Sequence, residues 1–245
     1  YTSYYENGQL KEEGTYKNGN QDGPFKSYYG YGQLKEEGTF KNGQSVGLWK
    51  FYYENGQLES EFTYKDGKLH GPYKSYYKNG QLEQEGTHNN GISDGPYKTY
   101  YCCRGQLRKE STYKNGNVDG PFKFYYENGQ LKEEGTLKDL ITYEGPLKTY
   151  YENGQLKKEG TYKNGNLDGP FKSYHDNGQL EEDSTYKNGE RDGPYKSYYD
   201  NGQLRYERTF KDDEQDGPYK SYYENGQLFS EGTFKNGEFI DSKEY

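Results

Sequence analysis

The most reactive residue types in this chain do not form a recognisable catalytic constellation. Its histidines are His70, His88 and His175. Each replaces a different residue of a repeated pattern, so we interpret all three as structural. No Ser/His/Asp, HExxH, P-loop or GxGxxG arrangement occurs in a suitable setting. Adjacent acids such as Glu12 and Glu13 point to opposite faces of a strand, which does not suit a two-carboxylate mechanism. We therefore predict a protein that is not an enzyme and needs no cofactor.

Metal binding is also not indicated. Cys102 and Cys103 are the only cysteines, and two ligands do not complete a structural zinc site. Adjacent cysteines are poorly placed to bond to each other, so we interpret them as turn residues. Loops of the form Asn-Gly-x-x-Asp-Gly, as at 164–169, bear some likeness to calcium-binding β-rolls. They lack the acids of an EF-hand and the GGxGxD spacing, and turn chemistry explains their Asn, Asp and Gly.

The elements that carry these residues are copies of one short unit. A Gln-Leu pair recurs at steps of 24 residues, with two steps of 25, and its glutamines are Gln9, Gln33, Gln57, Gln81, Gln106, Gln130, Gln155, Gln179, Gln203 and Gln227. Ten copies in register predict a single repeat domain over residues 1–245, in which each unit packs mainly on its neighbours. The last copy is degenerate from Glu238 onward, as a capping unit would be.

Each copy contains two turn signals and two short segments rich in Tyr, Phe and Thr. The first signal is Asn-Gly, as at Asn55-Gly56, for which we predict a type I′ hairpin turn. The second is the Asn-Gly-x-x-Asp-Gly-Pro stretch, for which we predict a longer loop. The segments between them are too short for helices. The fold class is therefore all-β: an elongated array of about ten stacked antiparallel hairpins in a single twisted, curled sheet.

A two-residue turn at Tyr31-Gly32 fixes the pairing of the flanking strands. It places Lys26 opposite Glu37, Phe25 opposite Gly38 and Tyr28 opposite Lys35. The same rule pairs opposite charges in copy after copy, which supports the register. These pairs are Lys50–Glu61, Lys74–Glu85, Lys123–Glu134, Lys148–Glu159, Lys172–Asp183, Lys196–Glu207 and Lys220–Glu231. Alternation then gives one face of aromatic residues, leucine and glycine, and one charged face with a row of tyrosines.

Composition adds two constraints on partners. The mean hydropathy is -1.49, yet 33 of the 245 residues are tyrosine. Tyrosine must therefore supply most of the core. The aromatic face must in turn be covered by curling of the sheet, by self-association or by a partner. The net charge is -8 with Lys and Glu interleaved, which argues against nucleic acid and against anionic lipid as main ligands. No apolar run reaches transmembrane length, so we do not expect membrane contact from this segment. Because the chain does not begin with Met, we expect it to be part of a longer or processed protein.

The repeated residues resemble a known family. Tyr-Tyr-x-Asn-Gly-x-Leu followed by Gly-Thr-Tyr-Lys-Asn-Gly and Asp-Gly-Pro-aromatic is similar to the bacterial variant of the MORN repeat, in register over nearly the whole chain. The resemblance implies a ribbon of stacked β-hairpins. It further implies scaffolding, contact with protein or lipid, or in some bacterial cases an antitoxin-like role. It brings no catalytic residue.

We predict a non-catalytic scaffold that binds a protein or peptide. The alternatives are a structural or surface component that self-associates into ribbons or filaments, and an antitoxin-like inhibitor of a neighbouring effector. The expected binding residues are the tyrosines of the charged face, one per copy: Tyr28, Tyr52, Tyr76, Tyr100, Tyr125, Tyr150, Tyr174, Tyr198 and Tyr222. Two irregular turns depart most from the repeated pattern and are further candidate binding surfaces. Their residues are Cys102, Cys103, Arg104, Leu140 and Ile141.

Overall fold

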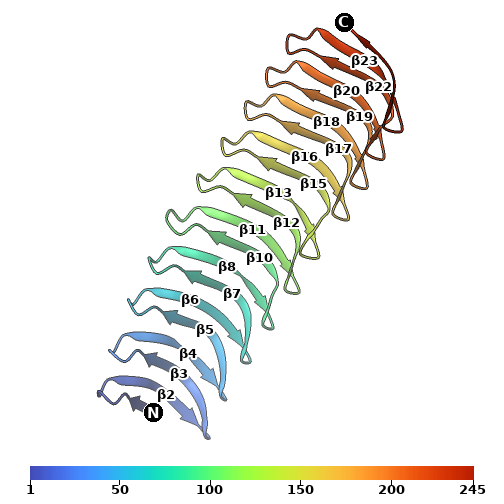
Figure 1. Ribbon diagram of the computed structural model, residues 1–245. Coiled ribbons are helices and arrows are strands. Elements are labelled where there is room, and N and C mark those ends of the chain that lie inside the picture. The colour runs from blue at the N-terminus through green and yellow to red at the C-terminus, as the bar shows by residue number, and fades with distance from the viewer. The chain divides into compact units, whose positions relative to one another are not determined.

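A computed structural model describes residues 1–245 and contains strands and turns without a helix (Figure 1). The chain divides into two compact units, Tyr1–Asp119 and Gly120–Tyr245. Each unit is an all-β array of consecutive antiparallel hairpins, and in Figure 1 the strands of each unit follow one another in chain order. The predicted fold class is thereby confirmed. No helix long and apolar enough to cross a bilayer is present.

The strands alternate between the two segments of each copy. In the first unit they are β1 (Thr2–Tyr4), β2 (Leu10–Lys17), β3 (Asn20–Tyr28), β4 (Leu34–Lys41), β5 (Gln44–Tyr52), β6 (Leu58–Lys65), β7 (Lys68–Tyr76), β8 (Leu82–Asn89), β9 (Ile92–Ser93), β10 (Gly95–Tyr100) and β11 (Leu107–Lys114). The point of division lies within β12 (Asn117–Tyr125). In the second unit the strands are β13 (Leu131–Lys138), β14 (Thr142–Tyr143), β15 (Gly145–Tyr150), β16 (Leu156–Lys163), β17 (Asn166–Tyr174), β18 (Leu180–Lys187), β19 (Glu190–Tyr198), β20 (Leu204–Lys211), β21 (Glu214–Gln215), β22 (Gly217–Tyr222), β23 (Leu228–Lys235) and β24 (Glu238–Glu244).

The two turns of each copy differ from their predicted forms. At the first turn only the glycine is left-handed, as at Gly8 with φ 81°, and its N–H donates to the carbonyl of Tyr5 at 2.9 Å. This is a three-residue loop with a glycine bulge, so the predicted type I′ turn is wrong here. The type I′ turn occurs instead at the second signal, where Asn18 (φ 52°) and Gly19 (φ 81°) connect the paired residues at the ends of β2 and β3. The predicted longer loop is therefore a tight turn followed by a bulge.

The bulges explain which pairings were predicted correctly. Near the first turn the three-residue loop shifts the register, so Tyr28 pairs with Leu34 and not with Lys35. Lys35 is the extra residue of a β-bulge, and beyond it the predicted register holds. All the predicted Lys–Glu and Lys–Asp pairs and the Phe25–Gly38 pair are present.

Successive hairpins are also joined by side chains at the first turns. The second tyrosine of each Tyr-Tyr pair donates its hydroxyl to the backbone carbonyl of the first tyrosine in the next copy, as from Tyr53 to Tyr76 at 2.7 Å. His175 replaces a tyrosine of this series, and its Nε2 lies 3.3 Å from the carbonyl oxygen of Tyr198. Because a carbonyl can only accept, this ring nitrogen carries the proton. The structural interpretation of His175 agrees with this contact.

The turn asparagine makes a second connection between copies. Asn177 Oδ1 accepts the backbone N–H of Gln179 at 2.9 Å, and its Nδ2 donates to the carbonyl of Asp200 in the next copy at 2.7 Å. Where tyrosine replaces this asparagine, the Tyr31 hydroxyl reaches the carbonyl of Glu54 at 3.3 Å. This asparagine therefore stabilises its own turn and its neighbour's position at once.

A pair of turn substitutions tests whether the asparagine of the first turn contributes more to stability than the asparagine of the second turn. Replacing Asn177 by alanine removes two hydrogen bonds and is expected to lower the free energy of unfolding by about 1–3 kcal/mol. Replacing Asn188, which is left-handed at φ 53°, by glycine is expected to change it by less than about 0.5 kcal/mol, because glycine adopts that geometry freely. Urea unfolding of both variants measures the difference, and equal effects would contradict the assignment.

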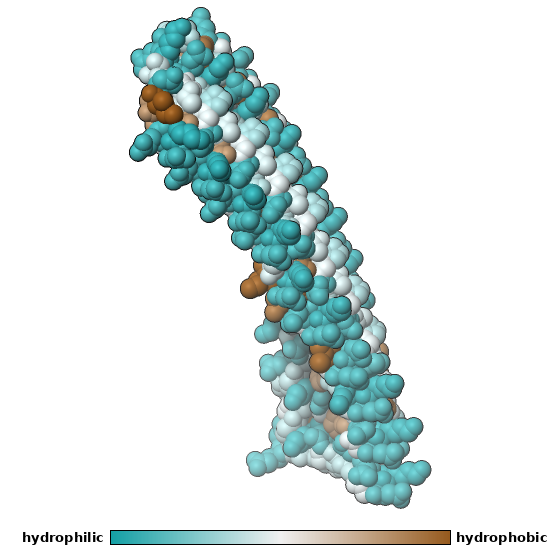
Figure 2. All heavy atoms as spheres, turned by 90° about the vertical axis from the view of Figure 1, so that its right-hand side faces the viewer, coloured by the Kyte–Doolittle hydropathy of each residue, from teal (hydrophilic) through white to brown (hydrophobic).

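The aromatic face forms the core of each unit. Among its most buried large side chains are Phe25, Trp49 and Tyr73 in the first unit, and Phe122 and Phe210 in the second. Rings of paired strands meet edge to face, as in Tyr195–Phe210 with centroids 5.4 Å apart. The rings thus bury one another, and the side of the molecule seen in Figure 2 is mostly hydrophilic with isolated hydrophobic groups.

Candidate functional site on the charged face

The charged face is built on a continuous ladder of lysines and acids in each unit. Each lysine lies between two acids, because both neighbouring strands place one opposite it: Lys196 pairs with Asp183 on one side and with Glu207 on the other. The Lys196 Nζ to Glu207 Oε1 distance is 3.0 Å, and this contact holds the pKa of Glu207 below its usual value. The hairpin register predicted from the sequence includes only one of the two acids beside each lysine. Because these side chains are partly exposed, each contact stabilises the fold by about 0.2–1 kcal/mol at most.

The predicted tyrosines lie beside this ladder at the ends of their strands. They are half-buried, and in most copies the hydroxyl donates to the ladder acid of the preceding copy at 2.6–3.2 Å. The donors with such a bond are Tyr28, Tyr52, Tyr76, Tyr100, Tyr150, Tyr174 and Tyr222. At Tyr198 the corresponding acid is Asp183, whose shorter side chain makes no such bond. Tyr125 occupies the same strand-end position on β12.

Burial and the hydrogen bonds to these acids raise the pKa values of tyrosines in the row. Partial burial, followed by the hydrogen bond to Glu37, raises the pKa of Tyr52 to about 12, and the equivalent effects with Glu159 raise the pKa of Tyr174 to about 12. The neutral phenol is favoured because a phenolate could not donate to the carboxylate and would be repelled by it. The tyrosines with these bonds are therefore uncharged at neutral pH, and their hydroxyls are held by the acids.

A row of exposed prolines lies on the other side of the ladder. Each proline is paired with a threonine of the next strand, as Pro146 is with Thr161 and Pro194 with Thr209. Between this row and the ladder a shallow pocket of about 240–350 Å³ recurs. Examples lie in both units, and each is lined by Pro, Thr, Lys and Glu at corresponding positions.

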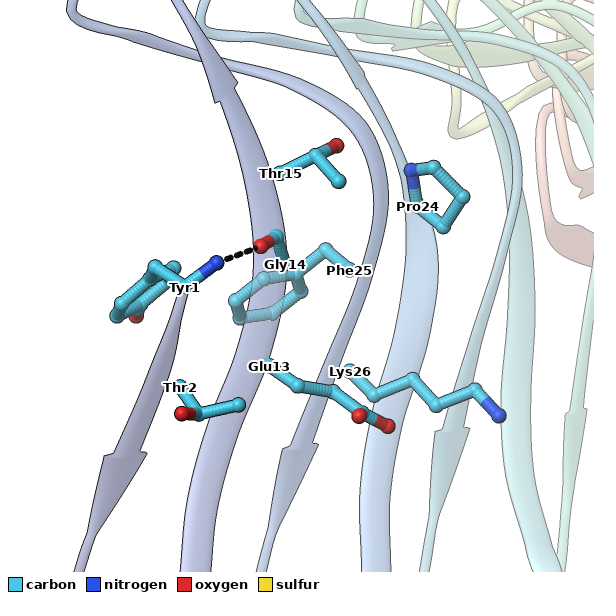
Figure 3. Close-up of a pocket in the computed structure, with 8 residues that line it drawn as sticks. All are labelled: Tyr1, Thr2, Glu13, Gly14, Thr15, Pro24, Phe25 and Lys26. Carbon is cyan, nitrogen blue, oxygen red and sulfur yellow. Dashed lines mark hydrogen bonds between the residues drawn. The ribbon is translucent and has the colours of Figure 1, made fainter.

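Figure 3 shows the pocket of the first unit. Glu13 and Lys26 lie at one end and Thr15 and Pro24 at the other, with Gly14 and Phe25 between them. The ring of Phe25 points to the aromatic face. The backbone of Phe25 and of its paired residue Gly14 therefore forms the floor of the pocket. These pockets were not predicted, although the recurrence of Pro and Thr on the face that carries Lys and Glu was a signal for them.

The polar groups of this face are largely engaged with one another. The lysines and acids are paired with one another, and most tyrosine hydroxyls of the row donate to an acid. No group of three or more His, Cys, Asp or Glu side chains is arranged to hold a metal ion. What the face presents to a ligand is ring edges, proline rings, threonine methyl groups and alternating charges.

None of the residues of the two irregular turns lines the pockets described above. Cys102, Cys103 and Arg104 are exposed in a first turn that is one residue longer than usual, where the backbone N–H of Gly105 donates to the carbonyl of Tyr101. Leu140 and Ile141 belong to a lengthened second turn, in which Leu140 is left-handed at φ 76° and the Ile141 side chain is 83% exposed. The turn with the cysteines begins two residues after Tyr100 of the tyrosine row, and Asn79 Nδ2 donates to the carbonyl of Cys102 at 3.0 Å. The predicted role of both turns in binding stays a prediction.

Comparisons with known proteins identify the repeat. The family described as MORN repeat variant matches residues 1–18, 21–42, 45–66, 69–90, 118–139, 143–164, 167–188, 191–212 and 215–236. The copy with the Cys102-Cys103 turn falls outside these matches, although it folds as the β10–β11 hairpin. No curated protein matches the chain.

Among solved structures, the chain is similar to parts of much larger chains. The crystal structure of TcdB2-TccC3-Cdc42 aligns with 88% of this chain at 13% identity and a TM-score of 0.24, and that of TcdB2-TccC3 aligns with 99% at 14% identity and a TM-score of 0.23. The chain spans about 14% of the length of each.

Proposed function

Since the chain belongs to the MORN repeat variant family, a repeat family that is generally non-catalytic, we propose that it is a scaffold whose charged face binds an extended segment of a partner protein. The observation that carries this proposal is the recurrence of one pocket at corresponding positions between the proline row and the Lys–Glu ladder. A ligand with a matching repeat can occupy successive pockets with the same contacts, so many weak contacts add up.

The spacing of the pockets favours a particular backbone conformation. One copy contributes two strands at about 4.8 Å each, so pockets of adjacent copies in a unit lie about 9.6 Å apart. A polyproline II helix rises about 9.3 Å per turn of three residues. A segment in this conformation that runs across the strands therefore places every third side chain into a pocket. Exposed tyrosine rings and proline rings are surfaces that such segments favour.

Selection from a library of displayed random peptides tests the proposal. We expect selected peptides to repeat an anchor residue every third position and to bind the wild-type chain in a saturable way. Replacing Pro146, Pro170 and Pro194 together by serine removes pocket walls without breaking a hydrogen bond and is expected to weaken binding about tenfold or more, about 1.4 kcal/mol. Replacing the exposed Lys163, Lys187 and Lys211 by serine is the matched control and should leave binding nearly unchanged.

The tyrosine row is tested with the same peptides. Replacing Tyr150, Tyr174 and Tyr198 by phenylalanine keeps the rings, so binding should be retained, whereas serine at the same positions should abolish it. The melting temperature of each variant shows whether the fold is intact. If the proline variant binds as well as the wild type, or if selected peptides show no three-residue period, the proposal is wrong.

A further inference from the structure

One charged residue lies within the aromatic face of the second unit. Arg208 pairs with Tyr195 of β19, at the position that glycine occupies in most copies, such as Gly38 and Gly160. Its guanidinium carbon lies 4.2 Å from the ring centroid of Tyr206 and 5.5 Å from that of Tyr219. The rings hold the guanidinium through its faces, and its N–H groups remain directed outward in its own plane.

At least one of these donors has no acceptor in the chain. Arg208 makes no ion pair with any acid of the chain, and its Nε is buried without a hydrogen-bond partner. Buried N–H groups without an acceptor are rare, and each needs an explanation such as a bound group or a water. On the paired strand, the Ser197 Oγ is also buried without a partner. Two orphaned polar atoms thus lie on neighbouring strands of the same face.

Hydroxyl groups lie on the two strands that follow Arg208 in the sheet. Ser221 lies opposite Tyr206 on the adjacent strand and Ser230 lies opposite Ser221, and their Oγ atoms are 2.7 Å apart. Ser230 in turn contacts the Tyr219 hydroxyl at 3.3 Å. Serine and tyrosine hydroxyls rotate to donate, so they can turn toward an acceptor that arrives beside the guanidinium.

The acids on neighbouring strands have other contacts or lie farther away. Glu182 accepts the hydroxyl of Ser184 at 2.7 Å, and Asp213 is paired with Arg191 at 2.8 Å. Glu244 lies opposite Ser230 on β24, three strands from Arg208. The positive charge of Arg208 is therefore not neutralised within the chain.

We propose that Arg208 is the centre of an oxyanion-binding site on the aromatic face, formed with the hydroxyl of Tyr219, which accepts from Ser230 and so keeps its own proton for a ligand. A carboxylate or phosphate group is the class of ligand that fits, because both accept a bidentate bond from the planar guanidinium and further bonds from hydroxyls. This site does not rest on the scaffold proposal, although Arg208 and Tyr219 also line one of the pockets of the charged face.

Two-dimensional ¹H–¹⁵N NMR of the arginine Nε–Hε groups tests the site. Inorganic phosphate and acetate are each titrated into the full chain, with chloride at matched ionic strength as the reference. We expect one Nε signal, absent in the Arg208→Met variant, to shift and saturate with phosphate or acetate but not with chloride. A response to phosphate alone assigns a phosphate site, and a response to acetate assigns a carboxylate site.

Variants of neighbouring residues supply the controls. Arg208→Lys keeps the charge without the planar fork and should weaken the interaction about tenfold or more, about 1.4 kcal/mol. Arg205→Met removes an exposed arginine of the same strand and should leave the response unchanged. The site is refuted if no signal saturates, if the Arg205 signal responds equally, or if Arg208→Lys binds as well as the wild type.

Discussion

Replacing Gly38 by valine is expected to lower the free energy of unfolding by about 3 kcal/mol or more, at or above the upper end of overpacking effects. A Cβ atom at Gly38 would lie 2.2 Å from Cδ2 of Trp49. Trp49 is only 4% exposed and is packed edge to face against Phe40 with ring centroids 4.8 Å apart. The indole ring therefore cannot move aside without opening the core of its copy and of both neighbours. Urea unfolding followed by tryptophan fluorescence measures the effect, since this is the only tryptophan.

The control for this prediction is a glycine in open space. A Cβ atom at Gly30 meets nothing within 4 Å, and Gly30 is not left-handed. Gly30→Val should therefore change the free energy of unfolding by less than about 0.5 kcal/mol, as surface substitutions usually do. Similar losses in both variants would show that valine acts through the backbone and not through contact with Trp49.

Raising the pH above 10 is expected to unfold the protein cooperatively. The pKa values of Tyr28, Tyr52, Tyr76, Tyr150 and Tyr174 are each raised to about 12 by burial and by neighbouring carboxylates. A folded-state pKa above the unfolded value of 10 means that the folded state binds the proton more tightly. The resulting stability is fully present below pH 10 and is lost as the pH rises from 10 to about 12. Because many tyrosines share this shift, their contributions add in one transition, which circular dichroism and phenolate absorbance would follow together.

Phenylalanine at two of these positions separates titration from packing. In a variant with Tyr52→Phe and Tyr76→Phe, two hydrogen bonds to Glu37 and Glu61 are lost, so stability at pH 8 should fall by about 1–3 kcal/mol. The same change removes two ionisable groups, so stability should depend less steeply on pH between 10 and 12. An unchanged slope would mean that other groups cause the alkaline transition.

The pairing of strand residues away from the turns could be predicted from the sequence, whereas the turn types could not. Both Asn-Gly signals have the same two residues, yet Asn7 is right-handed or extended and Asn18 is left-handed. The first asparagine is held by the next copy, as the bond from Asn7 Nδ2 to the carbonyl of Gly30 shows. This contact joins residues 23 positions apart, so a local propensity could not include it. The compensating bulge at Lys35 left the predicted Lys26–Glu37 pair correct even though the assumed turn was wrong.

The candidate site was predicted only in part for a similar reason. Alternation along a strand places Tyr28 and Lys26 on one face, and the structure agrees, because the Tyr28 hydroxyl bonds to Glu13, the acid opposite Lys26. That bond joins two copies and was not visible in one copy's pattern. The pockets were missed because their floor is backbone, formed where an aromatic ring and a glycine turn away to the other face.

The sequence by itself determined the repeat, its two strands, the cross-strand charge pairs and the division into an aromatic and a charged face. Each of these follows from periodicity and from the alternation of side chains within a strand, which are local properties. Only the tertiary structure decided the turn geometry, the two-sided ladder, the tyrosine–carboxylate bonds and the isolation of Arg208. These depend on which atoms of successive copies come within hydrogen-bonding distance, and that is set by how the strands bulge and stack, not by the order of residues in one copy.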